Sequence, residues 1–185
     1  MITQKIPLEK ILDYEQPTKY IVSSSVYSSD KNQVAVLTAG KTFILGYTNE
    51  SNGIFPKDKL PVIIFDDFTT ATKFVDFPFK VKSSAMKILH INTEIADPHY
   101  IFYLLQSLDF KVKKHKRHWI SEYSQINVEL PSIPEQQKIS RKLDKTLSFI
   151  TQEMEKVLPL LVKQKELFTS LRSAVLRDTF HINKN

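Results

Sequence analysis

The sequence predicts an α+β protein in which a curved, largely antiparallel sheet with flanking helices is followed by one long C-terminal helix. Three observations lead to this fold class. Short runs rich in β-branched and aromatic residues follow one another closely between residues 33 and 91. Two prolines stand at 131 and 134, and a helical pattern then continues almost to the end of the chain. The composition, 42% hydrophobic and 25% charged, is that of a globular protein.

The expected strands lie close together along the chain. They are QVAVLT (33–38), FILGY (43–47), LPVIIF (60–65), KFVDFPFKV (73–81) and AMKILHI (85–91). Such spacing favours antiparallel pairing over repeated βαβ units. PLEKILDY (7–14) is expected to form a helical turn or short helix, and ISEYSQINVELP (120–131) to be extended.

A first helix is predicted within DPHYIFYLLQSLDFKVKK, residues 97–114. Asp97 is a suitable N-cap, and Pro98 suits the first helical position because its missing N–H costs nothing there. The apolar residues that follow fall on one helical face: Ile101, Leu104, Leu105 and Leu108.

The stretch LPSIPEQQKI (130–139) divides the chain into two parts, a globular domain at 1–131 and a helical region at 132–185. Pro134 is tolerated in the first turn of a helix. Ser132 and Glu135 predict a capping box, in which the serine side chain accepts from the Glu135 amide and the glutamate reaches back to the serine amide.

The long helix carries an apolar seam with steps of 4 and 3 residues. The seam consists of Leu143, Leu147, Ile150, Met154, Val157, Leu161, Phe168, Leu171 and Val175, with Gln164 at the one polar position. Such a narrow stripe is typical of a coiled coil, whereas a helix packed on its own core seldom keeps the register this long. We expect the seam to pair with another molecule, or with itself if the chain folds back at Pro159.

Charge and composition narrow the functional classes. The net charge is +6, with +2 in residues 1–131 and +4 in residues 132–185, which suits a polyanionic partner. The chain has no cysteine, and this excludes disulfides and thiolate metal sites. It has no apolar run as long as a membrane span, and its start lacks the apolar core of a signal peptide. We therefore expect a soluble, cytoplasmic protein.

No catalytic motif is complete in the sequence. TAGKT (38–42) resembles the end of a phosphate-binding loop, but position 35 is alanine where that loop needs glycine. DPHY (97–100) reads as a helix cap, and Asp66–Asp67 as an ordinary turn rather than a pair of metal ligands. The five histidines show no metal-ligand spacing. No catalytic residue, metal site or cofactor site is predicted.

The stretch KVKKHKRHW (111–119) is the most basic in the chain, with five Lys or Arg among nine residues. It is either a solvated loop or a surface that contacts phosphates, with Arg117 or His118 able to reach a base edge.

With LPSIPEQQKISRKLD (130–144) and its heptad helix in view, the chain resembles the specificity subunit of type I restriction–modification systems. The helix ends in a phrase typical of that family, LFTSLRSAVLRDTF (167–180). Three stretches of the globular part resemble one class of its target recognition domains: DYEQPTKY (13–20), VLTAGKTFILGYTNE (36–50) and VIIFDDFTTATKFVDFPFKVKSSAMKIL (62–89). Full subunits hold two recognition domains and two conserved helices. The chain thus looks like a half-length form.

The resemblance implies a non-catalytic protein that reads double-stranded DNA. It implies as partners a second copy of the chain and modification subunits that bind S-adenosylmethionine and methylate adenine, and in some systems a restriction subunit. Two alternatives remain from the residues alone. The chain is a coiled-coil adaptor without DNA readout, or a stand-alone nuclease or methyltransferase, against which the failed motifs argue.

Candidate DNA contacts lie in the turns and in the basic stretch. They are Tyr20, Lys41, Thr42, Tyr47, Thr70, Lys73, Lys114, Lys116 and Arg117. The apolar seam is expected to pair antiparallel with a second copy. Its midpoint is Pro159, where a kink or break is expected. Modification subunits are expected to bind the remaining faces of the helix and the C-terminal residues Leu167, Leu171, Leu176 and Phe180.

Overall fold

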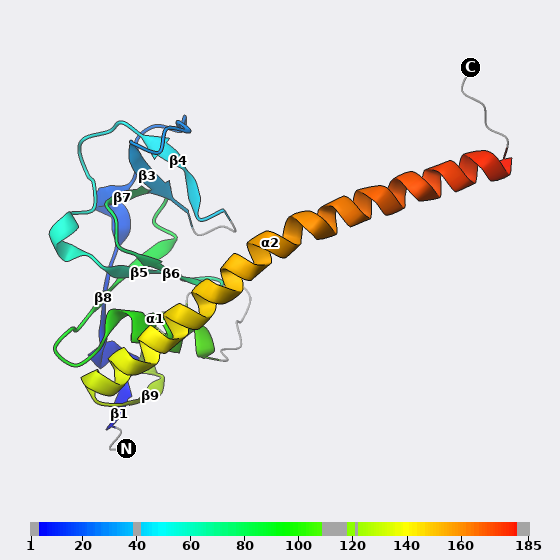
Figure 1. Ribbon diagram of the computed structural model, residues 1–185. Helices are drawn as coiled ribbons and strands as arrows, with labels where there is room; N and C mark the ends of the chain where they lie inside the picture. Colours follow the sequence, from blue (N-terminus) through cyan, green and yellow to red (C-terminus); the bar gives the residue numbers. More distant parts are fainter. Residues whose placement is uncertain (1–3, 39–41, 109–117, 121, 181–185) are drawn as a thin grey trace. The chain divides into compact units, whose positions relative to one another are not determined.

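The computed structural model describes residues 4–38, 42–108, 118–120 and 122–180, and the side chains of these ranges from 5 to 175 (Figure 1). The strands and helices follow in the order β1 (Gln4–Pro7), β2 (Leu12–Glu15), β3 (Val34–Leu37), β4 (Ile44–Thr48), β5 (Val62–Asp66), β6 (Thr72–Val75), β7 (Phe79–Val81), β8 (Met86–Ile91), α1 (Pro98–Ser107), β9 (Asn127–Leu130) and α2 (Ile133–Phe180). Short 3-10 turns lie at Leu8–Lys10, Pro17–Tyr20, Lys57–Lys59 and Tyr123–Gln125.

The strands form three sheets. The central one has the order β2–β8–β5–β6, and all its neighbours are antiparallel. A second sheet has the order β4–β3–β7, in which β3 pairs antiparallel with β4 and parallel with β7. The third is the antiparallel pair β1–β9. The predicted α+β, largely antiparallel fold is confirmed, with its strands divided among separate sheets.

The central sheet is buried on both faces, and β5 shows why. Its side chains alternate, so that Ile63 and Phe65 join one hydrophobic core while Val62 and Ile64 join another. The first core contains α1 together with Trp119 and Tyr123. The second contains residues of the β4–β3–β7 sheet. A continuous apolar strand sequence is what burial on two faces requires.

Helix α1 begins as predicted. The Asp97 side chain accepts a hydrogen bond of 2.9 Å from the Tyr100 amide, and Pro98 occupies the first position. The helix ends at Ser107, within the longer stretch that the sequence predicted. Residues 109–114 of that stretch lie outside the described residues.

Two local predictions were wrong in detail. Residues 73–81 form two strands rather than one, because β6 pairs with β5 while β7 leaves that ladder and pairs with β3. Pro78, which has no N–H to donate, lies between them. Residues 7–14 contain only one 3-10 turn before β2 begins at Leu12.

The start of α2 differs from the predicted capping box. The amides of Glu135 and Gln136 both donate to the Ser132 carbonyl, at 3.0 and 2.9 Å. The Ser132 hydroxyl donates to the Glu135 carboxylate at 3.2 Å. The serine side chain thus holds the glutamate instead of capping its amide.

Helix α2 is a single helix of 48 residues that runs through Pro159 without a break (Figure 1). The alternative of a hairpin folded at Pro159 was therefore wrong. Proline removes only one helical hydrogen bond, and here the carbonyl of Glu155 that loses its donor lies in an exposed stretch where water can satisfy it. At 1.5 Å per residue the helix is about 72 Å long.

The chain divides into two compact units, Met1–Ser140 and Arg141–Asn185. In the part of the chain that the structure describes, no helix has the length and apolarity needed to cross a membrane.

Candidate nucleic-acid interface

The turn between β5 and β6 is tightly organised. The Asp66 carboxylate accepts from the Phe68 amide at 2.9 Å and from the Thr69 amide at 3.4 Å, and its carbonyl accepts from the Thr70 amide at 2.9 Å. Thr70 has a φ of 59°. This left-handed conformation costs a β-branched residue about 1–2 kcal/mol. The turn therefore stores strain at Thr70, which is itself one of the predicted DNA contacts.

Asp67 joins this turn to the end of the basic stretch. Its carboxylate, 3% exposed, accepts from the amides of His118 at 3.1 Å and Trp119 at 2.9 Å. Its second oxygen lies 3.7 Å from the ammonium of the buried Lys87. The carboxylate therefore has a structural role. Among the residues that the structure describes, no group of three or more His, Cys, Asp or Glu could hold a metal ion.

His118, Trp119 and Tyr123 are core residues. Trp119 and Tyr123 are each 1% exposed and both pack against Phe65. The Tyr123 hydroxyl donates to the Leu105 carbonyl at 3.1 Å, and burial raises the pKa of Tyr123 to about 12. His118 is fully buried, so the expectation that it could reach a base edge was wrong.

Lys73 connects the β5–β6 hairpin to the turn between β3 and β4. Its ammonium lies 6.0 Å from the centre of the Phe43 ring, and the side chain is exposed. Phe43 follows directly after Thr42, another exposed predicted contact. The structure thus places Lys73, three residues after Thr70, near the residue that follows Thr42.

Tyr20 is part of the core. It is 4% exposed, packs edge-on against Phe55, and donates its hydroxyl to Glu15 at 3.0 Å. Such a side chain offers no surface to DNA. Burial tends to raise the pKa of Glu15, but hydrogen bonds from Lys19, His90 and Tyr20 outweigh it and hold the pKa below its ordinary value.

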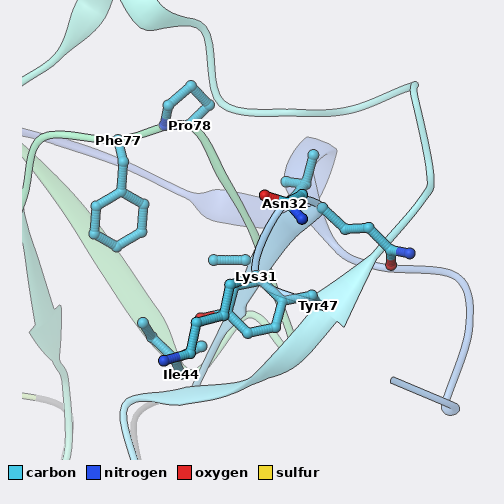
Figure 2. Close-up of a pocket in the computed structure, with 9 residues that line it drawn as sticks. Lys31, Asn32, Ile44, Tyr47, Phe77 and Pro78 are labelled. Carbon is cyan, nitrogen blue, oxygen red and sulfur yellow. The ribbon is translucent and has the colours of Figure 1, made fainter. Parts of the chain in front are cut away.

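Tyr47 lies at the other end of β4 from Thr42, and so apart from the group around Lys73. It lines a pocket of about 420 Å³. Figure 2 shows Phe77 and Pro78 on one side of this pocket and Ile44 and Tyr47 on another, with Lys31 and Asn32 beside them. The remaining predicted contacts, Lys41, Lys114, Lys116 and Arg117, lie outside the described residues.

Gln136, which the sequence analysis did not single out, fixes the start of α2. It is fully buried and its amide is satisfied on both sides. Its oxygen accepts from the Asp97 amide at 2.8 Å, and its nitrogen donates to the carbonyls of Ile95 at 3.0 Å and Pro131 at 2.8 Å. The signal was present in the PEQQ stretch, where a polar residue stands on the buried side of the first turn.

A second buried polar cluster centres on Lys80, which is 3% exposed. Its ammonium donates to the Asn52 carbonyl at 2.6 Å and lies 3.1 Å from Glu50. Hydrogen bonds from the Ser24 amide, Lys80 and the Ser23 amide hold the pKa of Glu50 below its ordinary value. This cluster fixes the segment after the Pro17–Tyr20 turn.

The apolar seam is exposed in the helical unit. Apart from the half-buried Leu143, its members are between 43% and 70% exposed: Leu147, Ile150, Met154, Val157, Leu161, Phe168, Leu171 and Val175. Further large apolar residues are exposed beside them, among them Leu158, Leu160 and Leu167. A contiguous apolar surface of this kind marks an interaction site.

No protein-family model matches the chain. It is 48% identical over 172 residues to the specificity subunit of the type I restriction enzymes EcoR124I and EcoR124II of Escherichia coli. The matched region covers 86% of this chain and 41% of that subunit, so the chain spans less than half of this relative's length.

Solved structures agree on the fold. A chain from a study of complex assembly and conformational transition in the type I restriction–modification system matches with a TM-score of 0.64, at 14% identity, over 96% of this chain and 45% of its own length. The type I S subunit of M. genitalium matches with a TM-score of 0.58, at 16% identity, over 90% of this chain and 44% of its own. The HsdS subunit of Thermoanaerobacter tengcongensis gives 0.54, at 11% identity, over 83% and 39%. The resemblance seen in the sequence is confirmed, and the chain is a relative of type I restriction–modification specificity subunits over an extent that fits one half of such a subunit.

Proposed function

We propose that the chain is the DNA-recognition subunit of a type I restriction–modification system. The observation that carries this proposal is the 48% identity to a specificity subunit, which runs through both the globular unit and the long helix. Residues 1–131 serve as the target recognition domain, and residues 132–185 as the dimerisation and spacer region. The chain itself is non-catalytic, and modification subunits that bind S-adenosylmethionine supply the methyl transfer.

The recognition surface is centred on the β5–β6 hairpin. Lys73 lies near Phe43, which follows Thr42, Thr70 stands in the adjoining turn, and Asp67 ties that turn to the end of the basic stretch. Lys73 suits a phosphate, while an exposed hydroxyl such as that of Thr42 can bond either phosphate or base edges. The basic residues of 111–117 add to the positive charge of this surface.

The apolar seam pairs with a second copy in antiparallel orientation. If the two-fold axis passes near residue 159, residues equally far from it on the two helices face each other. Leu147 then meets Leu171, and Ile150 meets Phe168. Val157 meets Leu161, and only the layer of Met154 and Gln164 is mixed. Parallel pairing would also align the seams, but it would place both recognition domains at one end of the pair.

The centre of this pairing is strongly apolar. In the heptad that the seam defines, Leu158 and Leu160 flank it near the axis, where each meets its own copy across the two-fold. Leu167 lies on the same flank as Leu160, one heptad further. The apolar face is therefore broader than a two-stranded coiled coil requires, which supports docking of modification subunits along the same helices.

A closed two-fold dimer presents the same reading surface twice. Its target is therefore an inverted repeat, two identical half-sites around an unspecified spacer. A helix of about 72 Å is a sufficient ruler to separate two recognition domains along DNA.

The test is a DNA-binding assay on the chain co-purified with modification subunits, with random duplex and a duplex that carries the methylated motif as competing ligands. We expect salt-dependent binding to both and a much higher affinity for the motif. The isolated chain should bind weakly. Association with modification subunits but no affinity for any duplex would favour the adaptor alternative. Cleavage or methylation by the chain alone would make it an enzyme.

A further inference from the structure

We propose that Phe68, at the tip of the β5–β6 turn, contacts the 5-methyl group of a thymine in the major groove. The inference rests on the proposed function and deepens it by naming a residue that reads a base. The predicted contact residues at this turn, Thr70 and Lys73, are polar. Phe68 therefore adds an apolar contact to them.

Phe68 is 43% exposed, directly after the buried Asp67. Ile120, directly after Trp119, is 58% exposed. Because Asp67 binds the Trp119 amide, these two exposed apolar residues are held at the same part of the molecule. A single exposed apolar residue is ordinary. Phe68 and Ile120 are two exposed apolar residues held beside predicted DNA contacts, and such apolar surface is typical of an interaction site.

The backbone of the turn that carries Phe68 is held by hydrogen bonds. The Phe68 amide is held by the Asp66 carboxylate at 2.9 Å, so the backbone that carries the ring is fixed. The turn is closed by the bond from the Asp66 amide to the Ala71 carbonyl at 2.9 Å. A side chain on a preorganised turn loses little conformational entropy when it binds, which suits it for recognition.

The backbone of this turn is strained at Thr70. Glycine or asparagine would occupy the left-handed position of this turn without cost, yet Thr70 stands there with a φ of 59°. A β-branched residue in this conformation is a genuine outlier, and such outliers cluster at functional sites. The threonine hydroxyl donates to the Thr69 carbonyl at 2.7 Å, a bond within the turn itself.

The chemistry of the ring decides the ligand. A phenyl group has no donor or acceptor, so it can discriminate bases only through apolar surface. In the major groove of an intact duplex that surface is the thymine 5-methyl group. Insertion between base pairs would require unstacking, which costs several times more than a groove contact gains.

The experiment measures the affinity of the assembled complex for a duplex that carries its methylated motif, with each thymine replaced singly by deoxyuridine. Such a motif necessarily holds thymine opposite its target adenine. For the wild type, loss of the contacted methyl should weaken binding about fourfold, the value of one buried carbon. Phe68→Ala should weaken binding to the thymine duplex by at least as much, and should be insensitive to that same replacement. Phe68→Leu, which keeps an apolar side chain, should remain sensitive.

Val26→Ala is the matched control, because Val26 is an exposed apolar residue on another segment, 81% exposed. It should leave every affinity within about twofold. If wild type and Phe68→Ala respond equally to every replacement, the inference is overturned while the proposed function stands. If a 2-aminopurine probe shows Phe68-dependent unstacking, the ring acts as a wedge and the methyl contact is overturned. If the wild-type complex binds no duplex specifically, the proposed function fails and this inference fails with it.

Discussion

The Asp67 carboxylate accepts a hydrogen bond of 2.9 Å from the Trp119 amide across 52 residues of sequence. This bond ties the β5–β6 turn to the end of the basic stretch. Two segments that were predicted separately to contact DNA are thereby fixed to one another. The proposed recognition surface thus rests on a carboxylate that is itself buried.

Replacement of Asp67 should be strongly destabilising. Asp67→Ala removes the acceptor of the Trp119 amide and one of the two acceptors of the His118 amide. It also leaves the buried Lys87 without this carboxylate, so we expect a loss of about 3–5 kcal/mol in the free energy of unfolding. Asp76→Ala, at an exposed aspartate in the next turn, is the control and should change it by less than about 0.5 kcal/mol. Urea denaturation measures both. A loss below about 1 kcal/mol for Asp67→Ala would show that the carboxylate is not an anchor.

Gln136 should be essential for the junction between the globular unit and α2. Gln136→Ala leaves the Asp97 amide and the Ile95 and Pro131 carbonyls without their partner, and we expect a loss of about 1–3 kcal/mol in the free energy of unfolding. Gln137→Ala makes the same chemical change at the next, exposed position and should be nearly neutral. Equal effects of the two substitutions would contradict the role given to Gln136.

The strands and the helix seam could be predicted because their signals are local. β5 is a continuous apolar run, and the seam repeats every heptad, so nearest neighbours in sequence suffice. The links between Asp67 and Trp119 and between Gln136 and Asp97 could not, because they join residues 52 and 39 positions apart. For the same reason the parallel pairing of β3 with β7 and the burial of Tyr20 were missed. The conformation of Thr70 was invisible because threonine seldom adopts it.

Lysines that contact phosphate should change the salt dependence of DNA binding. Lys73→Ala should weaken binding to all duplexes alike and reduce the salt slope by about one unit, and Lys114→Ala should do the same. Arg117→Ala should instead cost about 1–3 kcal/mol and relax discrimination at one base pair. Lys57→Ala, at an exposed lysine of the Lys57–Lys59 turn, is the control. An unchanged salt slope for Lys73→Ala would remove Lys73 from the interface.

The antiparallel register of the helix pair predicts an ion pair between copies. With the axis near residue 159, Asp144 of one chain lies close to Arg172 of the other, on equivalent flanks of the seam. Asp144→Arg or Arg172→Asp alone should weaken the dimer by placing like charges together, and the double exchange should restore it. Sedimentation equilibrium gives the dimer constants. If the double exchange is no better than either single one, the register is wrong.

The central claim is that two copies of this chain read the two halves of one DNA site. It is tested most directly by methylome sequencing of the genome that encodes the chain, with and without the gene. The account predicts that deletion abolishes adenine methylation at one motif, and that this motif is an inverted repeat around an unspecified spacer. An unchanged set of methylated motifs, or the loss of a non-palindromic motif that depends on this chain alone, would contradict it.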